Sequence, residues 1–296
     1  MDLLSVSDLS VEVLNHILRE TREIKENPGD YRNSLKGKSA VVIFEKPSTR
    51  TRVSFEVGIF QLGGKAVILN ADDMQLGRGE TIKDSARILS RYVDGIIARV
   101  NEHKTLVELA GHSDVPVVNA LSDLEHPCQA VSDLFTVREQ FGGFDVKMAY
   151  VGDGNNVCNS LILGCAMVGV EMWIATPEGY GPDRGIVDKA SGFSDKVKVM
   201  NDPLKAVRDA DVVYTDTWVS MGSENEEEER LSVFKGYQVN KELLGYAKPG
   251  CRVMHCMPLH RDVEITSEVV DGPGSIILEQ AENRLYAQKA ILAQLL

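Results

Sequence analysis

One stretch decides the fold class and locates the first candidate site: Ser39-Ala40-Val41-Val42-Ile43-Phe44-Glu45-Lys46-Pro47-Ser48-Thr49-Arg50-Thr51-Arg52. Its apolar part, Ala40 to Phe44, is typical of a buried strand, and Pro47 marks the strand's end. Apolar residues then recur at helical spacing, namely Val53, Val57 and Phe60. The stretch therefore predicts a strand followed by a helix, with hydroxyl and arginine side chains at the junction.

Such a junction is a natural anion site, because free backbone N–H groups and the positive end of the helix dipole meet there. Arg50 can add planar, charge-assisted hydrogen bonds to phosphate oxygens. The segment is not a Walker loop, because the glycines and the Gly-Lys-Ser/Thr ending are absent. Two interpretations stay open on the segment alone: a phosphate cradle over Ser48–Arg52, or a Ser/Thr helix cap with two solvated arginines.

The composition narrows the class of protein. A chain of 296 residues with 43% hydrophobic residues can form two ordinary domains or one large α/β domain. The formal net charge of -12 makes nucleic acid and anionic membranes unlikely partners, although a local arginine cluster can still bind a small anion. The N-terminus shows no secretory pattern, and the five cysteines include no Cys-x-x-Cys pair. We therefore expect a cytoplasmic protein.

Strand-like runs alternate with helical patterns in two series. The runs are Ala40–Phe44, Ala66–Leu69, Gly95–Val100 and Val115–Asn119, then Met148–Gly152, Met172–Thr176, Val197–Met200, Val212–Asp216 and Arg252–Met257. Such alternation predicts an α/β fold with two doubly wound domains, each a parallel sheet flanked by helices. We expect a first domain over 1–134 and a second over 135–280. The C-terminal helix, 281–296, is expected to cross back to the first domain.

In open parallel sheets, ligands bind beyond the carboxyl ends of the strands, and unusual polar residues follow several of these strands. Arg99 ends the third strand, and His126 and Gln129 follow the fourth. Together, Arg99, His126 and Gln129 offer two potentially cationic donors and an amide near the cradle. This set suits a substrate with phosphate and carbonyl oxygens. Taken alone, His126 is more often structural than catalytic, and Arg284 is more often an ordinary surface ion-pair partner.

The second series offers three further segments. Gly152-Asp153-Gly154-Asn155-Asn156 resembles a dinucleotide motif but lacks the third glycine and the ribose-binding acid, so helix capping by Asn155, or binding of a carboxylate or amide, is preferred. His255-Cys256-Met257-Pro258 fits no standard metal spacing, and nothing nearby marks Cys256 as a nucleophile. Asp216 suits a cationic amine, or else caps a turn, and Gly222 with the acidic run to Glu229 has the composition of a mobile lid.

Five motifs in order resemble the aspartate/ornithine carbamoyltransferase family. They are Phe44–Glu56, His126-Pro127-x-Gln129, Asp216-x-Trp218-x-Ser220-Met221-Gly222, His255-Cys256-Met257-Pro258 and Ala281-Glu282-Asn283-Arg284. The resemblance spans Phe44 to Lys289 and implies a trimer that needs neither a metal nor an organic cofactor. Met257 stands where the family usually has leucine. The loop Leu76–Glu80 lacks the lysine of the aspartate branch, which favours the ornithine branch.

The resemblance also implies roles for individual residues. Ser48, Thr49, Arg50 and Thr51 would bind phosphate, and Gln75 would reach a neighbouring subunit's site. Arg99, His126 and Thr51 would hold the carbonyl oxygen and Gln129 the carbamoyl amide, while Arg284, Cys256 and Met257 would complete that pocket. The ornithine ligands would be Asn156, Asp216, Ser220 and Met221. The implied catalytic set is Arg99, His126, Cys256, Arg284 and Thr51.

The implied reaction joins carbamoyl phosphate and L-ornithine to give L-citrulline and phosphate. Alternatives are carbamoyl transfer to putrescine or another diamino acid, and a non-catalytic paralogue that only binds carbamoyl phosphate. An NAD-dependent oxidoreductase is a more distant alternative.

Overall fold

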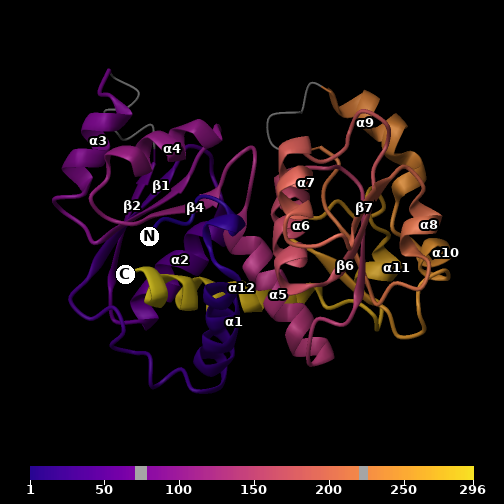
Figure 1. The fold of residues 1–296 in the computed structure, drawn as a ribbon, viewed down its shortest axis with the longest axis horizontal. Coiled ribbons are helices and arrows are strands. Elements are labelled where there is room, and N and C mark those ends of the chain that lie inside the picture. The colour runs from indigo at the N-terminus through magenta and orange to yellow at the C-terminus, as the bar shows by residue number, and fades with distance from the viewer. Residues whose placement is uncertain (71–78, 220–225) are drawn as a thin grey trace. The chain divides into compact units, whose positions relative to one another are not determined.

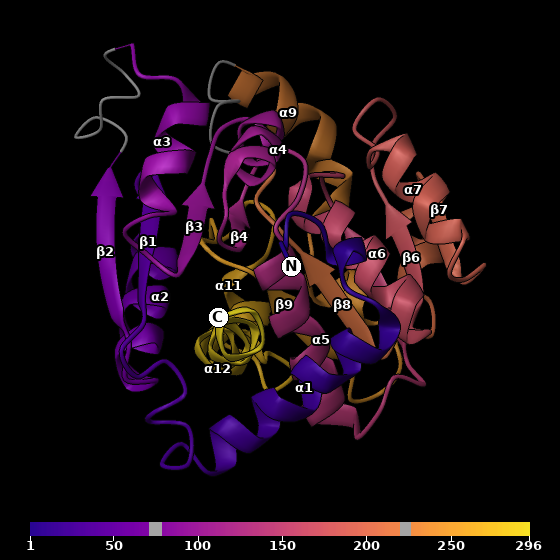
Figure 2. The ribbon, with the colours of Figure 1, turned by 60° about the vertical axis from the view of Figure 1, so that its left-hand side comes forward.

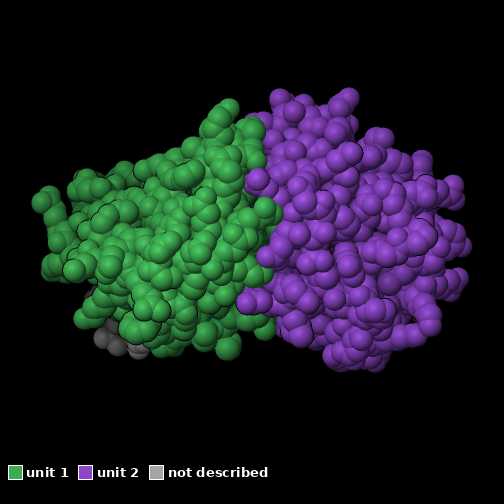
Figure 3. Space-filling model, turned by 90° about the horizontal axis from the view of Figure 1, so that it is seen from below, with its two compact units in different colours: residues 1–135, 283–296 green, residues 136–282 purple. Residues whose placement is uncertain are grey.

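The computed structural model describes residues 1–70, 79–219 and 226–296. The chain forms two compact units: unit 1 contains residues 1–135 and 283–296, and unit 2 contains residues 136–282 (Figure 3). Both boundaries fall inside helices, one in α5 (Pro127–Phe141) and one in α12 (Ile277–Leu295). Within the described ranges, no helix is long and apolar enough to cross a membrane.

Unit 1 is built on a parallel sheet with the strand order β2-β1-β3-β4. Its strands are β1 (Ser39–Phe44), β2 (Lys65–Asn70), β3 (Gly95–Arg99) and β4 (Val117–Leu121). The central strands β1 and β3 are almost entirely buried, as their apolar and β-branched residues predict for a sheet covered on both faces. The register of β3 against β4 shifts between Ala98 and Arg99, at the end of the strand where a ligand is expected.

Helices cover both faces of this sheet (Figures 1 and 2). They are η1 (Val6–Asp8), α1 (Val11–Glu26), α2 (Thr49–Gln61), α3 (Ile82–Leu89), α4 (His103–His112) and the unit 1 portions of α5 and α12. Helices α3 and α4 pack on the sheet face that presents Val41 and Ile43, whereas α2 lies on the other face. Helices α1 and α12 lie side by side, joined by a 2.7 Å hydrogen bond from Lys25 Nζ to Asn283 Oδ1.

Unit 2 contains a second parallel sheet with the order β7-β6-β5-β8-β9. Its strands are β5 (Lys147–Val151), β6 (Glu171–Ala175), β7 (Val197–Met200), β8 (Val212–Thr215) and β9 (Arg252–His255). The helices are α6 (Asn156–Val168), α7 (Arg184–Ser191), α8 (Pro203–Val207), α9 (Glu227–Val233), η5 (Phe234–Tyr237), α10 (Lys241–Leu244) and α11 (Ser267–Val270). Helices α6 and α7 pack on β6 and β7, and an apolar cluster including Val213 and Val253 joins the sheet to α8, α10 and α11.

The predicted fold class is confirmed, since both sheets are parallel and helices flank each of them. The apolar residues that predicted α2 do not form the face that this helix buries within its own unit. The buried residues of that helix include Phe55 and Ile59, whereas Val53 is 53% exposed and Phe60 is 77% exposed. Helical spacing of apolar residues identified the helix correctly, but it did not identify the face that packs against this chain's own core.

Each sheet has one position at which the strand order reverses, so that the chain crosses to one side of the sheet from one strand and to the other side from its neighbour. A ligand is expected at this position. In unit 1 this position lies between β1 and β3, so the loops that follow Phe44 and Arg99 meet. In unit 2 it lies between β5 and β8, so the loops that follow Val151 and Thr215 meet. The topology therefore brings together residues that are 51 positions apart in unit 1 and 61 positions apart in unit 2.

Candidate active site

The predicted phosphate cradle, Ser48–Arg52, lies where β1 leads into α2. Ser48 occupies the N-cap position of α2, but its hydroxyl makes no capping hydrogen bond. Instead it accepts a 3.1 Å hydrogen bond from Arg99 Nη1. The first N–H groups of a helix have no partner inside the helix, so those of Thr49 to Thr51 are available to an anion. Arg50 is exposed beside them, so its cation is within reach of an anion from solvent.

Thr51 lies at the centre of a buried arginine pair. Its hydroxyl accepts a 2.7 Å hydrogen bond from Arg284 Nη2 and a 3.4 Å contact from Arg99 Nη1. The Thr51 side chain is fully buried, and both arginines are almost so. Two guanidinium groups that share one hydroxyl form a strong positive field, which would stabilise a phosphate or a developing oxyanion.

Burial changes the protonation of the groups around this pair. Desolvation, together with the charges of Arg284 and Arg50, lowers the pKa of Arg99 to about 10, so Arg99 is still a cation at neutral pH. Burial also lowers the pKa of His126 well below 6.5, and the charges of Arg284 and Arg99 lower it further. His126 is therefore a neutral imidazole at physiological pH, able to donate one hydrogen bond without adding a third charge.

The amide of Gln129 is held in one orientation. Arg284 Nη1 donates to Gln129 Oε1 at 3.3 Å, and Gln129 Nε2 donates to Asp133 Oδ1 at 2.8 Å. An amide can be turned over without changing its shape, but here a donor lies on one side and a carboxylate on the other. The carbonyl oxygen of Gln129 therefore lies on the arginine side, where it can also accept hydrogen bonds from a carbamoyl NH2 group. The sequence analysis did not single out Asp133.

In unit 2, the loop after β5 and the loop after β8 meet through side chains. Asn155 caps α6 by accepting from the N–H groups of Val157 and Cys158, as the capping interpretation predicted. Its Nδ2 donates to Asp216 Oδ2 at 2.7 Å, while Asp216 Oδ1 accepts from the Thr217 N–H at 2.8 Å. Asp216 is thus a buried carboxylate with a fixed orientation, which suits a positively charged amine.

The glycine before Asn155 has a steric role. A Cβ on Gly154 would lie 2.2 Å from the backbone nitrogen of Pro182, so no other residue fits there. The close approach of these two backbones fixes the loop that carries Asp153, Asn155 and Asn156. Asn156 is half-buried at the first position of α6.

A second cluster, which sequence analysis missed, surrounds Asp153. Arg230 Nη1 lies 3.0 Å from Asp153 Oδ2 and donates to the Trp218 carbonyl at 3.0 Å. The guanidinium also lies 5.0 Å from the ring centroid of Tyr180. Burial raises the pKa of Asp153 to about 6, although Arg230 acts in the opposite direction. Arg230 follows an acidic run, so its sequence context indicated only a surface ion pair.

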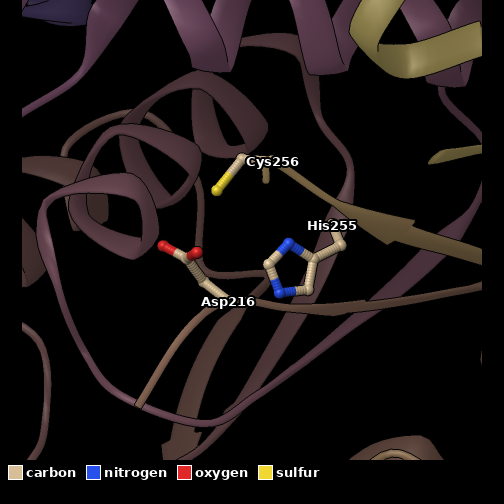
Figure 4. A group of neighbouring side chains, drawn as sticks. All are labelled: Asp216, His255 and Cys256. Carbon is tan, nitrogen blue, oxygen red and sulfur yellow. The ribbon is translucent and has the colours of Figure 1, made fainter. Parts of the chain in front are cut away.

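Three side chains of unit 2 are close enough to suggest a metal site: Asp216, His255 and Cys256 lie within 4.8 Å of one another (Figure 4). The hydrogen bonds of the histidine argue against one. Its Nδ1 accepts from the Met257 N–H at 2.9 Å, and its Nε2 is 3.2 Å from Glu264 Oε1. Both ring nitrogens are occupied by protein groups, so the imidazole has no free lone pair for a metal.

The predicted site residues thus fall into two sets. Unit 1 holds Ser48, Thr49, Arg50, Thr51, Arg99, His126, Gln129 and Arg284, and unit 2 holds Asn156, Asp216, Cys256 and Met257. Cys256 and Met257 were expected to complete the carbamoyl pocket, and they follow β9 of unit 2. Gln75, Ser220 and Met221 lie outside the described residues, as does much of the predicted lid.

Comparison with known proteins identifies the family. Residues 1–139 match the family model "Aspartate/ornithine carbamoyltransferase, carbamoyl-P binding domain", and residues 144–295 match the corresponding "Asp/Orn binding domain". The sequence is 54% identical to an ornithine carbamoyltransferase from Archaeoglobus fulgidus, over 99% of this chain and 97% of the relative.

Solved structures show the same fold. An ornithine carbamoyltransferase from Pyrococcus furiosus superposes with a TM-score of 0.94 at 51% identity, over 99% of this chain and 96% of that chain. An N-acetyl-L-ornithine transcarbamylase superposes with a TM-score of 0.89 over 100% of both chains, but at 30% identity.

Proposed function

Since this chain belongs to the aspartate/ornithine carbamoyltransferase family, we propose that it transfers the carbamoyl group of carbamoyl phosphate to the side-chain amine of L-ornithine. The products are L-citrulline and phosphate. The observation that carries the proposal is the network in which Arg99 and Arg284 share the Thr51 hydroxyl beside the N-terminus of α2. Residues 1–134 with 281–296 would bind carbamoyl phosphate, and residues 135–280 would bind ornithine.

The reaction needs stabilisation of two negative charges. The amine attacks the carbamoyl carbon, the carbonyl oxygen gains negative charge, and the bond to the phosphate oxygen breaks. Arg99, His126 and the Thr51 hydroxyl are proposed to stabilise the oxyanion, at about 3 kcal/mol for each well-placed donor. The departing phosphate would be stabilised by Ser48, Thr49, Arg50 and the helix N-terminus, and it would carry away the proton that the amine loses. The proposed chemistry therefore requires no cofactor.

The nucleophile must be a neutral amine, although the free amine has a pKa of about 10.4. Asp216 is proposed to hold the α-amino group, so that the side-chain amine points away from the carboxylate. Asn156, Ser220 and Met221 would complete the ornithine site, and Cys256 would lie near the reacting amine. In the carbamoyl pocket we propose Gln129, Arg284 and the backbone of Cys256 and Met257, with Gln75 contributed by a neighbouring subunit.

Ornithine is preferred over its rivals on chemical grounds. Putrescine has no α-carboxylate and no distinct α-amino group, so the Asp216 contact would not select one of its ends. Aspartate has a second carboxylate, which the buried carboxylate of Asp216 would repel. A paralogue that binds without turnover is disfavoured because the buried pair of Arg99 and Arg284 is intact. An acylated ornithine is the strongest rival substrate, but the N-acetyl-L-ornithine transcarbamylase structure is only 30% identical to this chain.

We further propose a cytoplasmic homotrimer. The support within the chain is the exposed apolar face of α2, formed by Val53, Val57 and Phe60. A face of this kind, with Phe60 77% exposed, is typical of a surface that a second subunit covers. None of the five cysteines forms a disulfide bond in the structure, which fits a reducing compartment.

A substrate panel tests the proposal. The full-length protein is supplied with carbamoyl phosphate and, in turn, ornithine, N-acetylornithine, putrescine or aspartate, and the ureido product is measured. Ornithine is expected to be preferred by at least about a hundredfold in kcat/KM, since a site built for a charged group rejects analogues that lack it. Comparable turnover of any of the other three would refute the substrate assignment.

A further inference from the structure

Glu264 is a buried carboxylate that the proposed mechanism does not use. Its side chain is 0% exposed, and it lies in the connection that follows β9. Its Oε1 lies 3.2 Å from His255 Nε2 and accepts from the His260 N–H at 2.5 Å. Burying a carboxyl group is costly unless other groups donate to it, and these two contacts supply donors to Oε1.

The first contact fixes the tautomer of His255. The Met257 N–H donates to His255 Nδ1 at 2.9 Å, so Nδ1 is an acceptor and the proton is on Nε2. Nε2 then donates to Glu264. Met257 has a φ of 58°, a conformation that non-glycine residues rarely adopt and that needs support from its surroundings. Through His255, the carboxylate therefore supports the strained backbone that follows Cys256.

The second contact leads to the strand-end loop of β8. The imidazole of His260, whose side chain is 54% exposed, lies with Nδ1 3.2 Å from Thr217 Oγ1. The Thr217 hydroxyl donates to the Val219 carbonyl at 3.1 Å, so it can accept from His260 Nδ1. Thr217 directly follows Asp216, and its N–H donates to that carboxylate.

We propose that Glu264 is a positioning residue for the half-site of unit 2. Through His255 it sets the backbone next to Cys256, and through His260 it sets the residue next to Asp216. One carboxylate thus fixes the relative register of the loops that follow β8 and β9. The proposal deepens the proposed function and rests on it, because the loops after β8 and β9 carry Asp216 and Cys256, which are proposed to contact ornithine.

The test compares two substitutions of the carboxylate in the full-length protein. Glu264→Met keeps the volume but removes both acceptor oxygens, whereas Glu264→Gln keeps one of them. We expect the KM for ornithine to rise about tenfold in Glu264→Met, the equivalent of one hydrogen bond to a charged group, and less in Glu264→Gln. The Kd for carbamoyl phosphate, measured by calorimetry without ornithine, is expected to stay within about twofold. Glu268→Gln is the matched control, because Glu268 pairs with Lys241 at the surface.

A second readout does not depend on ornithine turnover. Hydrogen exchange of the Met257 amide is expected to be slow in the parent protein and in Glu268→Gln. It is expected to be about tenfold faster in Glu264→Met, with a smaller increase in Glu264→Gln, which keeps one acceptor oxygen. An unchanged exchange rate in a folded Glu264 variant would overturn the proposal, as would an equal loss of affinity for both substrates. If the parent makes no citrulline, the proposed function fails, while the exchange rates still decide the role of Glu264.

Discussion

Arg284 donates a 2.7 Å hydrogen bond to the hydroxyl of Thr51, a residue 233 positions earlier in the chain. The same hydroxyl lies 3.4 Å from Arg99 Nη1. One small side chain on α2 thus bridges two buried guanidinium groups, although like charges repel each other. This arrangement supports the interpretation of the start of α2 as an anion site over that of an ordinary helix cap.

Removing that hydroxyl tests its role. Thr51→Val keeps the shape of the side chain but leaves both arginines without their shared acceptor, so kcat should fall by about 10² to 10³, as for loss of one oxyanion donor. The free energy of unfolding should change by less than about 2 kcal/mol, since the shape is kept. The measurements are steady-state kinetics and chemical denaturation, with Thr105→Val on α4 as the control. A Thr51→Val enzyme with parental kcat would contradict this account of the hydroxyl.

Arg284 should not be replaceable by lysine. Its two terminal nitrogens donate to different partners, Nη2 to Thr51 and Nη1 to Gln129, which a single ammonium group cannot reach together. We expect Arg284→Lys to lower kcat/KM for carbamoyl phosphate by at least about a hundredfold, although the charge is kept. Arg87→Lys on α3 serves as the control for a surface arginine. If Arg284→Lys retains more than about half of the parental kcat/KM, charge alone explains the role of Arg284 and the two-partner argument fails.

The pH dependence of catalysis should have no limb at the usual histidine pKa. Burial and two arginine charges lower the pKa of His126 well below 6.5, so this imidazole is already neutral at pH 6. The remaining titration is that of the substrate amine, which must lose a proton before it attacks. We expect kcat/KM for ornithine to rise steadily between about pH 6 and 9. A flat profile over that range, or a clear inflection near 6.5, would be evidence against this assignment.

Stability should depend on pH through Asp153. Its pKa is raised to about 6 in the folded protein from the usual 3.8, mainly because the carboxyl is buried. Between these two pH values the folded state binds more protons than the unfolded state, so the contribution of this group to stability falls as pH rises from about 4 to 6. The loss is of the order of 3 kcal/mol for this group alone.

Comparison of Asp153→Asn with the parent isolates this contribution. The free energy of unfolding, measured from pH 4 to 7 by chemical denaturation, should fall less steeply with pH in the variant. Arg230→Met should have the opposite effect, because it removes the cation that opposes the rise in the pKa of Asp153. Parallel curves for all three proteins would show that Asp153 does not titrate in this range.

The exposed face of α2 should control assembly. Phe60→Glu places a charge on the face that we assign to a subunit contact, so sedimentation should show dissociation of the parental oligomer. Phe193→Glu, at an exposed aromatic residue of unit 2, should leave the assembly intact. A Phe60→Glu protein with the parental sedimentation coefficient would remove this support for the trimer.

The sequence was sufficient for the fold class because the strands of both sheets consist of β-branched and apolar residues bounded by clear breaks. It also predicted where polar residues would gather, since the carboxyl ends of parallel strands meet at one edge. The apolar residues of α2 show the limit of that reasoning. Apolar residues at helical spacing indicate that one face of a helix is buried, but they do not show whether it packs in the core of its own chain or against a partner. Phe60 is exposed in the single chain.

Residues that act through other residues were harder to find. Arg230 contacts Asp153 across 77 positions, and Glu264 contacts a histidine nine positions away through a loop that no periodicity predicts. The orientation of Gln129 depends on Asp133, one helical turn later, which was visible in the sequence as an i to i+4 pair. Only the tertiary structure shows which charged residues are buried and which are solvated.

Transfer of a labelled carbamoyl group tests the central claim most directly. The purified protein is given carbamoyl phosphate labelled with ¹³C at the carbonyl carbon, together with L-ornithine, and both the label and the released phosphate are followed by NMR. The account predicts that the label appears in the ureido carbon of citrulline, with one phosphate released for each citrulline formed. Phosphate release that leaves ornithine unlabelled would contradict it.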